Sequence, residues 1–200
     1  TELLKQGPVT WEGRLRPSID GLTVYPPLEH GTLRAWIAVG GSPESVIRAA
    51  HYGLPLMLAI IGGSAERFAP FADLYRKALA QFGKQPQPIG YHSPGYIAET
   101  DEQAAAELWP HHSVMMNRIG AERGWGPTTP AHFASEIESG ALVVGSPETA
   151  AAKIAAGVRA LGAERVDLKM AVGTLPHENI MRSIELYATE VVPRVRELLA

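Results

Sequence analysis

Two continuous apolar runs, at residues 36–39 and 56–61, dominate the hydrophobic pattern of the first half of the chain. Continuous apolar runs of this length, without alternation, indicate parallel strands that are covered on both faces. Between them, Ser42-Pro43-Glu44-Ser45 has the order typical of a helix start, with a serine cap, a proline in the first turn and an acidic residue. Gly53 ends this helix after Tyr52. The stretch therefore predicts a strand, a glycine turn, a helix and a second strand.

The pattern changes to helical spacing after the second strand. Gly62-Gly63-Ser64 predicts a turn, and apolar residues three and four positions apart predict a helix from Pro70 to Gly83. Residues 89–99 look like a strand that is broken at Pro94-Gly95. The capping box at residues 100–103 then predicts a helix that ends near 120–124, with Pro110 as a kink.

The last third of the chain is less regular. Glycine and proline punctuate residues 124–146, which we expect to form an insertion or a mobile loop with a short helix around 130–138. A helix should run from Ser146 to Gly162, a strand over 165–172, and helix again over 177–199 with a break or restart at Pro193. The last helix should turn four side chains inward: Ile180, Ile184, Tyr187 and Val191.

Four strands alternating with helices predict an α/β fold with a parallel sheet. Four such units are half of a (β/α)8 barrel. Before the first core strand, residues 9–28 predict a hairpin, and residues 1–6 read as the end of a helix stopped by Gly7-Pro8. A helix end without its start predicts further sequence upstream.

Composition narrows the function classes. The net charge of −3 and the absence of a basic block argue against nucleic acid as the main partner, and no apolar run is long enough for a membrane span. The chain has no cysteine, which excludes a thiol nucleophile and iron–sulfur clusters. No histidine pair has zinc spacing, so we predict no metal site. The first residues do not resemble a signal peptide, and we expect a cytoplasmic protein.

The glycine turn Gly40-Gly41-Ser42 is the candidate anion site, because backbone N–H groups at a helix start point outward toward a ligand. Ser-Pro-Glu recurs at residues 146–148, after Gly145. Helix capping alone explains the shared letters, so the motif does not by itself require a phosphate. The first copy has an additional glycine and directly follows a strand, which places it at the carboxyl end of the sheet, where ligands bind in parallel α/β folds.

Other candidate residues have a structural alternative beside the functional one. His92, on a predicted strand, faces either a ligand or the packed core. His111 and His112 are adjacent on a helix and are expected on a solvated face, and Trp125 either packs or covers a substrate.

Three stretches together resemble the bacterial luciferase-like, flavin-dependent monooxygenase family: residues 36–56, residues 144–149 with the helix and strand that follow, and residues 175–193. The resemblance implies a (β/α)8 barrel of which this chain is the C-terminal portion, about the second half of the barrel plus an insertion, forming one domain over residues 1–200. It implies FMN, or the deazaflavin F420, at the carboxyl ends of the strands. By position, Gly40, Gly41, Ser42 and Ser45 would hold the phosphate, and Ala59 and Ile60 would lie near the isoalloxazine ring.

The resemblance implies a flavin-dependent oxidoreductase that uses oxygen and a small organic substrate, with a flavin reductase as a partner. The resemblance assigns no catalytic residue and no particular substrate to this sequence. The alternatives are a non-catalytic half-barrel that binds flavin or a partner chain, and an open α/β fold that binds another phosphorylated ligand. Because a half-barrel would have unpaired strand edges, we expect either a homo-oligomer or a longer polypeptide.

Overall fold

A computed structural model describes residues 7–29 and 33–200, so the helix end predicted at residues 1–6 lies outside the described residues. The chain divides into two compact units, Thr1–Ala35 and Trp36–Ala200. In the first unit, strands β1 (Val9–Trp11) and β2 (Ile19–Leu22) form an antiparallel pair. This pair is the hairpin predicted for residues 9–28.

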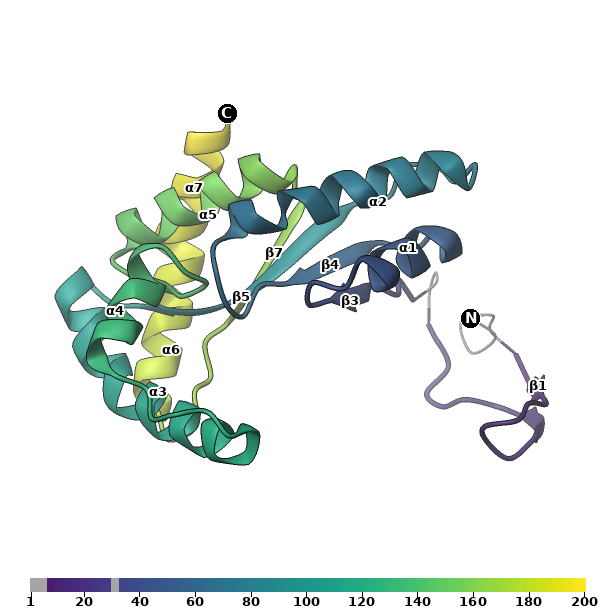
Figure 1. The fold of residues 1–200 in the computed structure, drawn as a ribbon, viewed down its shortest axis with the longest axis horizontal. Coiled ribbons are helices and arrows are strands. Elements are labelled where there is room, and N and C mark those ends of the chain that lie inside the picture. Colours follow the sequence, from purple (N-terminus) through teal and green to yellow (C-terminus); the bar gives the residue numbers. More distant parts are fainter. Residues whose placement is uncertain (1–6, 30–32) are drawn as a thin grey trace. The chain divides into compact units, whose positions relative to one another are not determined.

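The second unit is built on a parallel sheet (Figure 1). Strands β3 (Ile37–Val39), β4 (Leu56–Ala59), β5 (Ile89–Ile97) and β7 (Arg165–Lys169) pair in this order. A fifth, short strand, β6 (Val143–Gly145), pairs with the end of β5. The α/β prediction is confirmed, and within the described residues the sheet does not close into a barrel.

The predicted strand break at Pro94-Gly95 is wrong, because β5 runs through both residues. The carbonyls of Pro88 and His92 point to β4, and the Ala98 N–H bonds to Gly145 of β6. The even-numbered residues of β5 therefore direct their backbone N–H and C=O groups to one side of the strand, the side along which β4 and then β6 pair. The missing N–H of Pro94 falls between the last β4 pair, at His92, and the first β6 pair, at Gly95, so no ladder bond is lost.

The helices follow the predicted starts and stops closely. They are α1 (Pro43–Tyr52), the 3-10 turn η2 (Ala65–Phe68), α2 (Ala69–Gln81), α3 (Asp101–Arg123), α4 (Pro130–Glu138), α5 (Pro147–Leu161), α6 (His177–Leu186), the π-helical turn η3 (Tyr187–Val191) and α7 (Val192–Leu199). α3 is continuous through Pro110. Across the described residues, no helix is long and apolar enough to cross a membrane.

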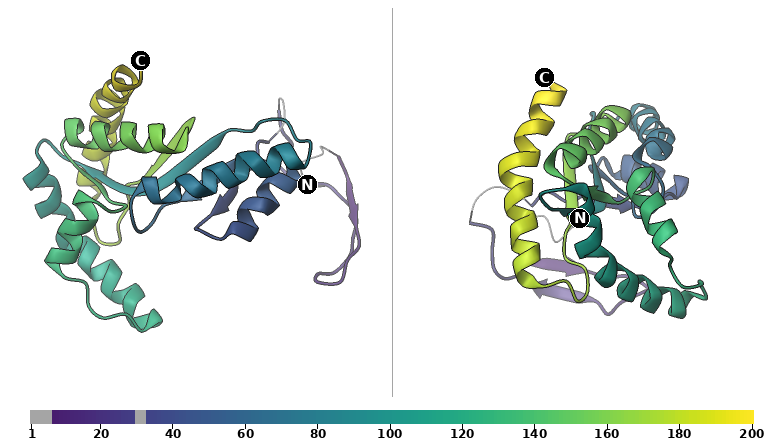
Figure 2. Two further views of the ribbon diagram at one scale, coloured as in Figure 1. Left: turned by 45° about the horizontal axis from the view of Figure 1, so that its top comes forward. Right: turned by 90° about the vertical axis from the view of Figure 1, so that its left-hand side faces the viewer.

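The C-terminal helices form one continuous rod rather than two broken pieces (Figure 2). The π-helical turn η3 ends at Val191, and α7 starts at Val192 with Pro193 in its first turn, so the helix restarts there without a break. A π turn is one way to accommodate a proline that lacks its N–H. The inward position predicted for Ile184 is wrong: its side chain is 43% exposed, whereas Ser183 is fully buried. Ser183 takes that position because its hydroxyl accepts a hydrogen bond from the Ile97 N–H at 2.8 Å.

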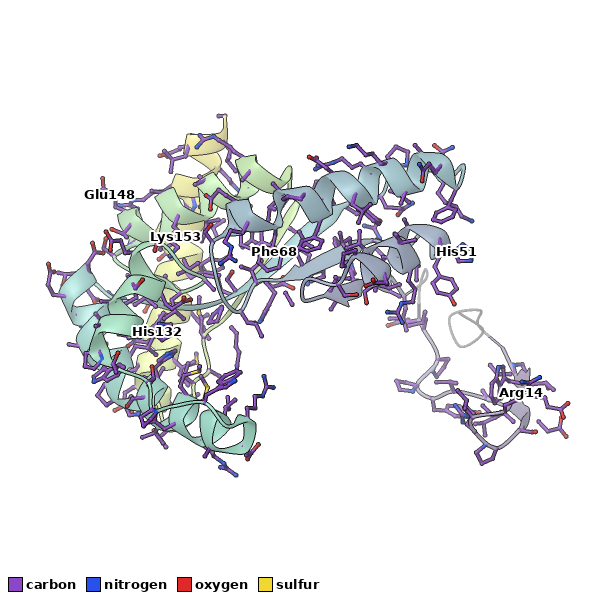
Figure 3. All side chains as sticks on the ribbon, in the orientation of Figure 1. Arg14, His51, Phe68, His132, Glu148 and Lys153 are labelled. Carbon is purple, nitrogen blue, oxygen red and sulfur yellow. The ribbon has the colours of Figure 1, made fainter. Side chains whose placement is uncertain are left out.

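The segment 124–146 contains α4 and β6, and Lys153 of α5 ties it to the rest of the unit (Figure 3). The Lys153 ammonium donates to the carbonyl oxygens of Ile137 (2.5 Å) and Leu142 (2.8 Å), where the end of α4 leaves carbonyls without helical partners. Phe133 of α4 is buried. Desolvation lowers the pKa of Lys153.

The two faces of the sheet differ in what covers them. Leu56, Leu58, Ile89 and Tyr91 belong to a core cluster with residues of α1, α2 and α5. Because side chains alternate along a strand, the neighbouring positions face the other way. On that inner face Ala38 is exposed, and Ala59 and His92 are half-buried.

Candidate functional site

The predicted anion site lies where β3 ends and α1 begins. Gly41 has φ +115°, a left-handed conformation that favours glycine. A Cβ added at Gly40 or Gly41 would meet no atom within 4 Å, so the space above the turn is open. The turn therefore leaves room for a group that approaches its backbone closely.

Side chains of α1 surround this turn. Ser42 is the N-cap, and its Oγ accepts a hydrogen bond from the Ser45 N–H at 3.3 Å. The same hydroxyl donates to Glu44 Oε2 at 2.7 Å, and this bond lowers the pKa of Glu44. The Arg48 guanidinium donates to Ser45 Oγ at 2.7 Å. Pro43 has no N–H, so the backbone donors that the turn can offer to a phosphate come from its other residues, among them Gly41 and Ser42.

The second Ser-Pro-Glu copy is closed by a carboxylate of the chain itself. Asp101 accepts hydrogen bonds from the Ser146 N–H at 2.6 Å and from Thr149 Oγ1 at 2.9 Å, and these bonds lower its pKa. A Cβ at Gly145 would lie 2.7 Å from Asp101 Oδ1. At the start of α5 the Asp101 carboxylate thus bonds to a backbone N–H, whereas at the start of α1 the Glu44 carboxylate bonds only to the Ser42 hydroxyl and the space above Gly40 and Gly41 is open.

The other predicted cofactor residues lie at the end of β4 and on β5. Ala59 and His92 are register partners on the inner face, and both are half-buried. The Ile60 side chain is 1% exposed and packs in the core with α1 and α2, and its N–H donates to His92 O at 2.8 Å. Ala59 and His92 are therefore the members of the set whose side chains are available to a ligand on the inner face.

Further aromatic and charged side chains share this inner face. The Arg165 guanidinium lies 5.5 Å from the ring centroid of Trp36 and bonds to Asp167 at 3.0 Å. Asp167 is the register partner of His92. Gly90 leaves the space that Trp36 and Met57 fill, because a Cβ there would come within 3.2 Å of both. The inner face thus combines an aromatic ring with polar groups, a surface suited to a flat, polar ligand.

A second polar cluster, at the carboxyl end of β5, is internally satisfied. Glu107 accepts from Tyr96 Oη at 2.5 Å, from Gln103 Nε2 at 2.8 Å and from Asn179 Nδ2 at 3.3 Å. Burial and the bond to Glu107 raise the pKa of Tyr96 to about 12. This network links β5, α3 and α6.

The remaining candidates lie on α3 and directly after it. His112 was expected on a solvated face, but it is 8% exposed and packs 5.0 Å from the Phe133 ring, and burial lowers its pKa. His111 bonds to Thr174 at 2.8 Å. Trp125 is 52% exposed, with Arg123 over its ring. Among the residues that the structure describes, no group of three or more histidine and carboxylate side chains is arranged to hold a metal ion.

Sequence reasoning missed three residues at the two helix starts. Arg48 is three positions after Ser45, and this spacing places both side chains on one helix face. The contact between them could therefore have been predicted from the sequence. No sequence spacing predicts the bond from Ser42 to Glu44. The same is true of the contact between Asp101 and Ser146, which lies 45 residues later.

The family described as luciferase-like monooxygenase matches residues 1–165. No curated protein sequence matches the chain. Among solved structures, monooxygenase RslO1 from Streptomyces bottropensis has a TM-score of 0.73 at 24% identity, over 96% of this chain and 57% of that one.

Two other neighbours carry different cofactors. The oxygenating constituent of 3,6-diketocamphane monooxygenase from Pseudomonas putida, in complex with FMN, has a TM-score of 0.69 at 16% identity, over 96% of this chain and 60% of that one. An F420-dependent secondary alcohol dehydrogenase, in complex with an F420-acetone adduct, has a TM-score of 0.65 at 14% identity, over 97% of this chain and 58% of that one.

The chain thus spans less than two thirds of the length of these structures. The fold they share with it is the TIM-barrel type that the sequence predicts. The family match covers most of the chain, including the whole Gly40–Ser45 turn and β3, β4 and β5. The chain therefore belongs to the luciferase-like monooxygenase family.

Proposed function

We propose that the chain is part of a flavin-dependent oxidoreductase whose cofactor phosphate binds at Gly40, Gly41, Ser42 and Ser45. The observation that carries this proposal is the contrast between the two Ser-Pro-Glu helix starts. Asp101 fills the second one, whereas no atom outside the adjacent residues of the chain lies within 4 Å of a Cβ built at Gly40 or Gly41. An open helix N-terminus attracts anions through its N–H groups and its dipole.

The proposal places the flavin ring along the inner face, toward Ala59 and His92. Ala59 is the last residue of β4, and His92 is its register partner within β5, on the opposite face from the core cluster. When bound, the flavin supplies the redox chemistry with oxygen and a small organic substrate, while the chain supplies binding and orientation. FMN is the cofactor we favour, with F420 as the alternative. The proposal includes a flavin reductase partner and a cytoplasmic location.

A non-catalytic, flavin-binding or partner-binding half-barrel is the second candidate. It is favoured by the open sheet, because β3 and β7 each pair with one strand only among the described residues. Unpaired edges of parallel strands are sites for pairing with another segment or chain.

A titration of the purified chain with FMN and with F420, followed by visible absorption and flavin fluorescence, tests the proposal. We expect saturable binding of one of the two, with a shift of the flavin bands. Absence of binding of both cofactors would contradict the assignment. Binding without oxidation of NAD(P)H in the presence of a flavin reductase would favour the non-catalytic candidate.

A further inference from the structure

The hydroxyl of Ser42 is already engaged in the ligand-free protein. It donates to Glu44 Oε2 at 2.7 Å, while its oxygen accepts the Ser45 N–H. A serine hydroxyl has one proton to donate. A phosphate oxygen at this turn and the Glu44 carboxylate would therefore compete for the same proton.

Glu44 also sets the charge at the mouth of the turn. Its carboxylate is exposed and negatively charged at neutral pH, as for an ordinary glutamate, and the bond from Ser42 lowers its pKa further. A phosphate that replaces Glu44 on Ser42 meets this charge at close range, and like charges repel.

Arg48 is the cation within reach of the same turn. Its guanidinium is exposed and bonds to Ser45 Oγ at 2.7 Å, one of the four residues proposed to hold the phosphate. A guanidinium has five N–H donors, so it can keep one bond to Ser45 and direct others to a phosphate.

We infer that Glu44 and Arg48 set the phosphate affinity of the turn: Glu44 competes with the phosphate for Ser42, and Arg48 pairs with the bound phosphate. This inference rests on the proposed function, since it concerns the same turn. Binding breaks the bond from Ser42 to Glu44 and transfers its donor to the phosphate. Arg48 offsets the repulsion between the phosphate and the displaced carboxylate.

The second copy offers a natural contrast. Glu148 stands at the same position of its motif, on the first turn of α5 (Figure 3), but Ser146 Oγ donates to Thr149 Oγ1 instead of to a glutamate. The anion there is Asp101. Glu148→Gln is therefore a matched control that removes a first-turn carboxylate without changing the Gly40–Ser45 turn.

The test compares FMN with riboflavin, which lacks the phosphate, by fluorescence titration of the wild type and of the E44Q, R48M and E148Q variants. We expect E44Q to tighten FMN binding and R48M to weaken it, each by about threefold to fivefold, the upper part of the range for an exposed charge pair. Riboflavin binding should not change in either variant, and E148Q should match the wild type. An unchanged FMN affinity in E44Q and R48M, or equal changes for FMN and riboflavin, would overturn the inference.

A second titration, with inorganic phosphate and detection by the amide resonances of Gly41 and Ser42, separates this inference from the proposed function. Suppose that no flavin binds, but that phosphate shifts these amide resonances with a lower Kd in E44Q than in the wild type. The inference then stands and the flavin assignment fails. If phosphate leaves both amides unchanged in wild type and E44Q, the inference fails as well.

Discussion

At the scale of single residues, the function of the Gly40–Ser45 turn depends on what its neighbours leave free. Gly41 adopts φ +115°, and no side chain fills the space above it. Ser42 combines two tasks, since it caps α1 and presents its hydroxyl at the opening of the turn. The corresponding Ser146 caps α5 and donates its hydroxyl to Thr149, while Asp101 occupies that helix start. Similar sequence letters thus support different roles.

Replacing Ser42 with alanine should weaken FMN binding by about 1 kcal/mol or more, roughly fivefold, because a hydrogen bond to a charged group is lost. Fluorescence titration with FMN and riboflavin measures the change, and the riboflavin affinity should stay constant.

The matched control for this prediction is Ser146→Ala. Both substitutions remove a helix cap, which costs about 1 kcal/mol of stability, but only the first removes a ligand donor. Equal FMN affinities for the two variants would place the phosphate elsewhere.

At the scale of elements, most helix boundaries could be predicted from the sequence pattern, because caps and glycine stops depend on residues adjacent in the chain. Ser42, Thr100 and Ser146 all cap the helices that they were predicted to start. The errors arose where a distant partner decides the outcome. β5 continues through Pro94 because the neighbouring edge has a gap there, and His112 is buried because α4 covers it. Neither the gap in strand pairing beside Pro94 nor the packing of α4 over His112 can be predicted from residues nearby in the sequence.

The contact of Asp101 with the start of α5 should contribute measurably to stability. Replacing Asp101 with alanine leaves the Ser146 N–H and Thr149 hydroxyl without their anionic partner, and we expect a loss of about 1–3 kcal/mol in the free energy of unfolding. Urea denaturation measures this change.

Asp73→Ala is the control for this substitution. Asp73 pairs with Arg76 at 3.3 Å, but its side chain is 66% exposed, so its removal should cost close to nothing. If both variants lose the same stability, the internal anion at α5 has no special role.

Buried tyrosine hydroxyls link the packing of these elements to pH. Burial raises the pKa of Tyr75 to about 12, and its hydroxyl donates to Leu54 O at 2.7 Å. In the folded state Tyr75 keeps a proton that the unfolded chain releases near pH 10, so its contribution to stability is present below about pH 10 and is lost as the pH rises toward 12.

Tyr75→Phe tests this sign. The wild type should be more stable than the variant at pH 8, by about 1 kcal/mol for the lost hydrogen bond, and this difference should shrink between pH 10 and 12. Denaturant unfolding at each pH measures it. A difference that stays constant or grows with pH would contradict the prediction.

At the scale of the whole molecule, the sequence predicted a parallel α/β fold and the family, and both are confirmed. The fifth strand, β6, was not predicted as a strand because its three residues were read as the end of an irregular segment. The cofactor site is only partly accessible to sequence reasoning. The motif located the turn, but the openness of one copy and the closure of the other depend on Asp101, which folding brings to Ser146.

The central claim is that the chain binds a flavin phosphate at the Gly40–Ser45 turn and not at the second Ser-Pro-Glu helix start. The most direct measurement is a titration of the isotope-labelled chain with FMN and then with riboflavin, followed by backbone amide resonances. We predict FMN-dependent shifts at Gly40, Gly41, Ser42 and Ser45 that riboflavin does not reproduce, with residues 145–149 unchanged. Shifts at residues 145–149, or saturable FMN binding that leaves residues 40–45 unchanged, would contradict the account.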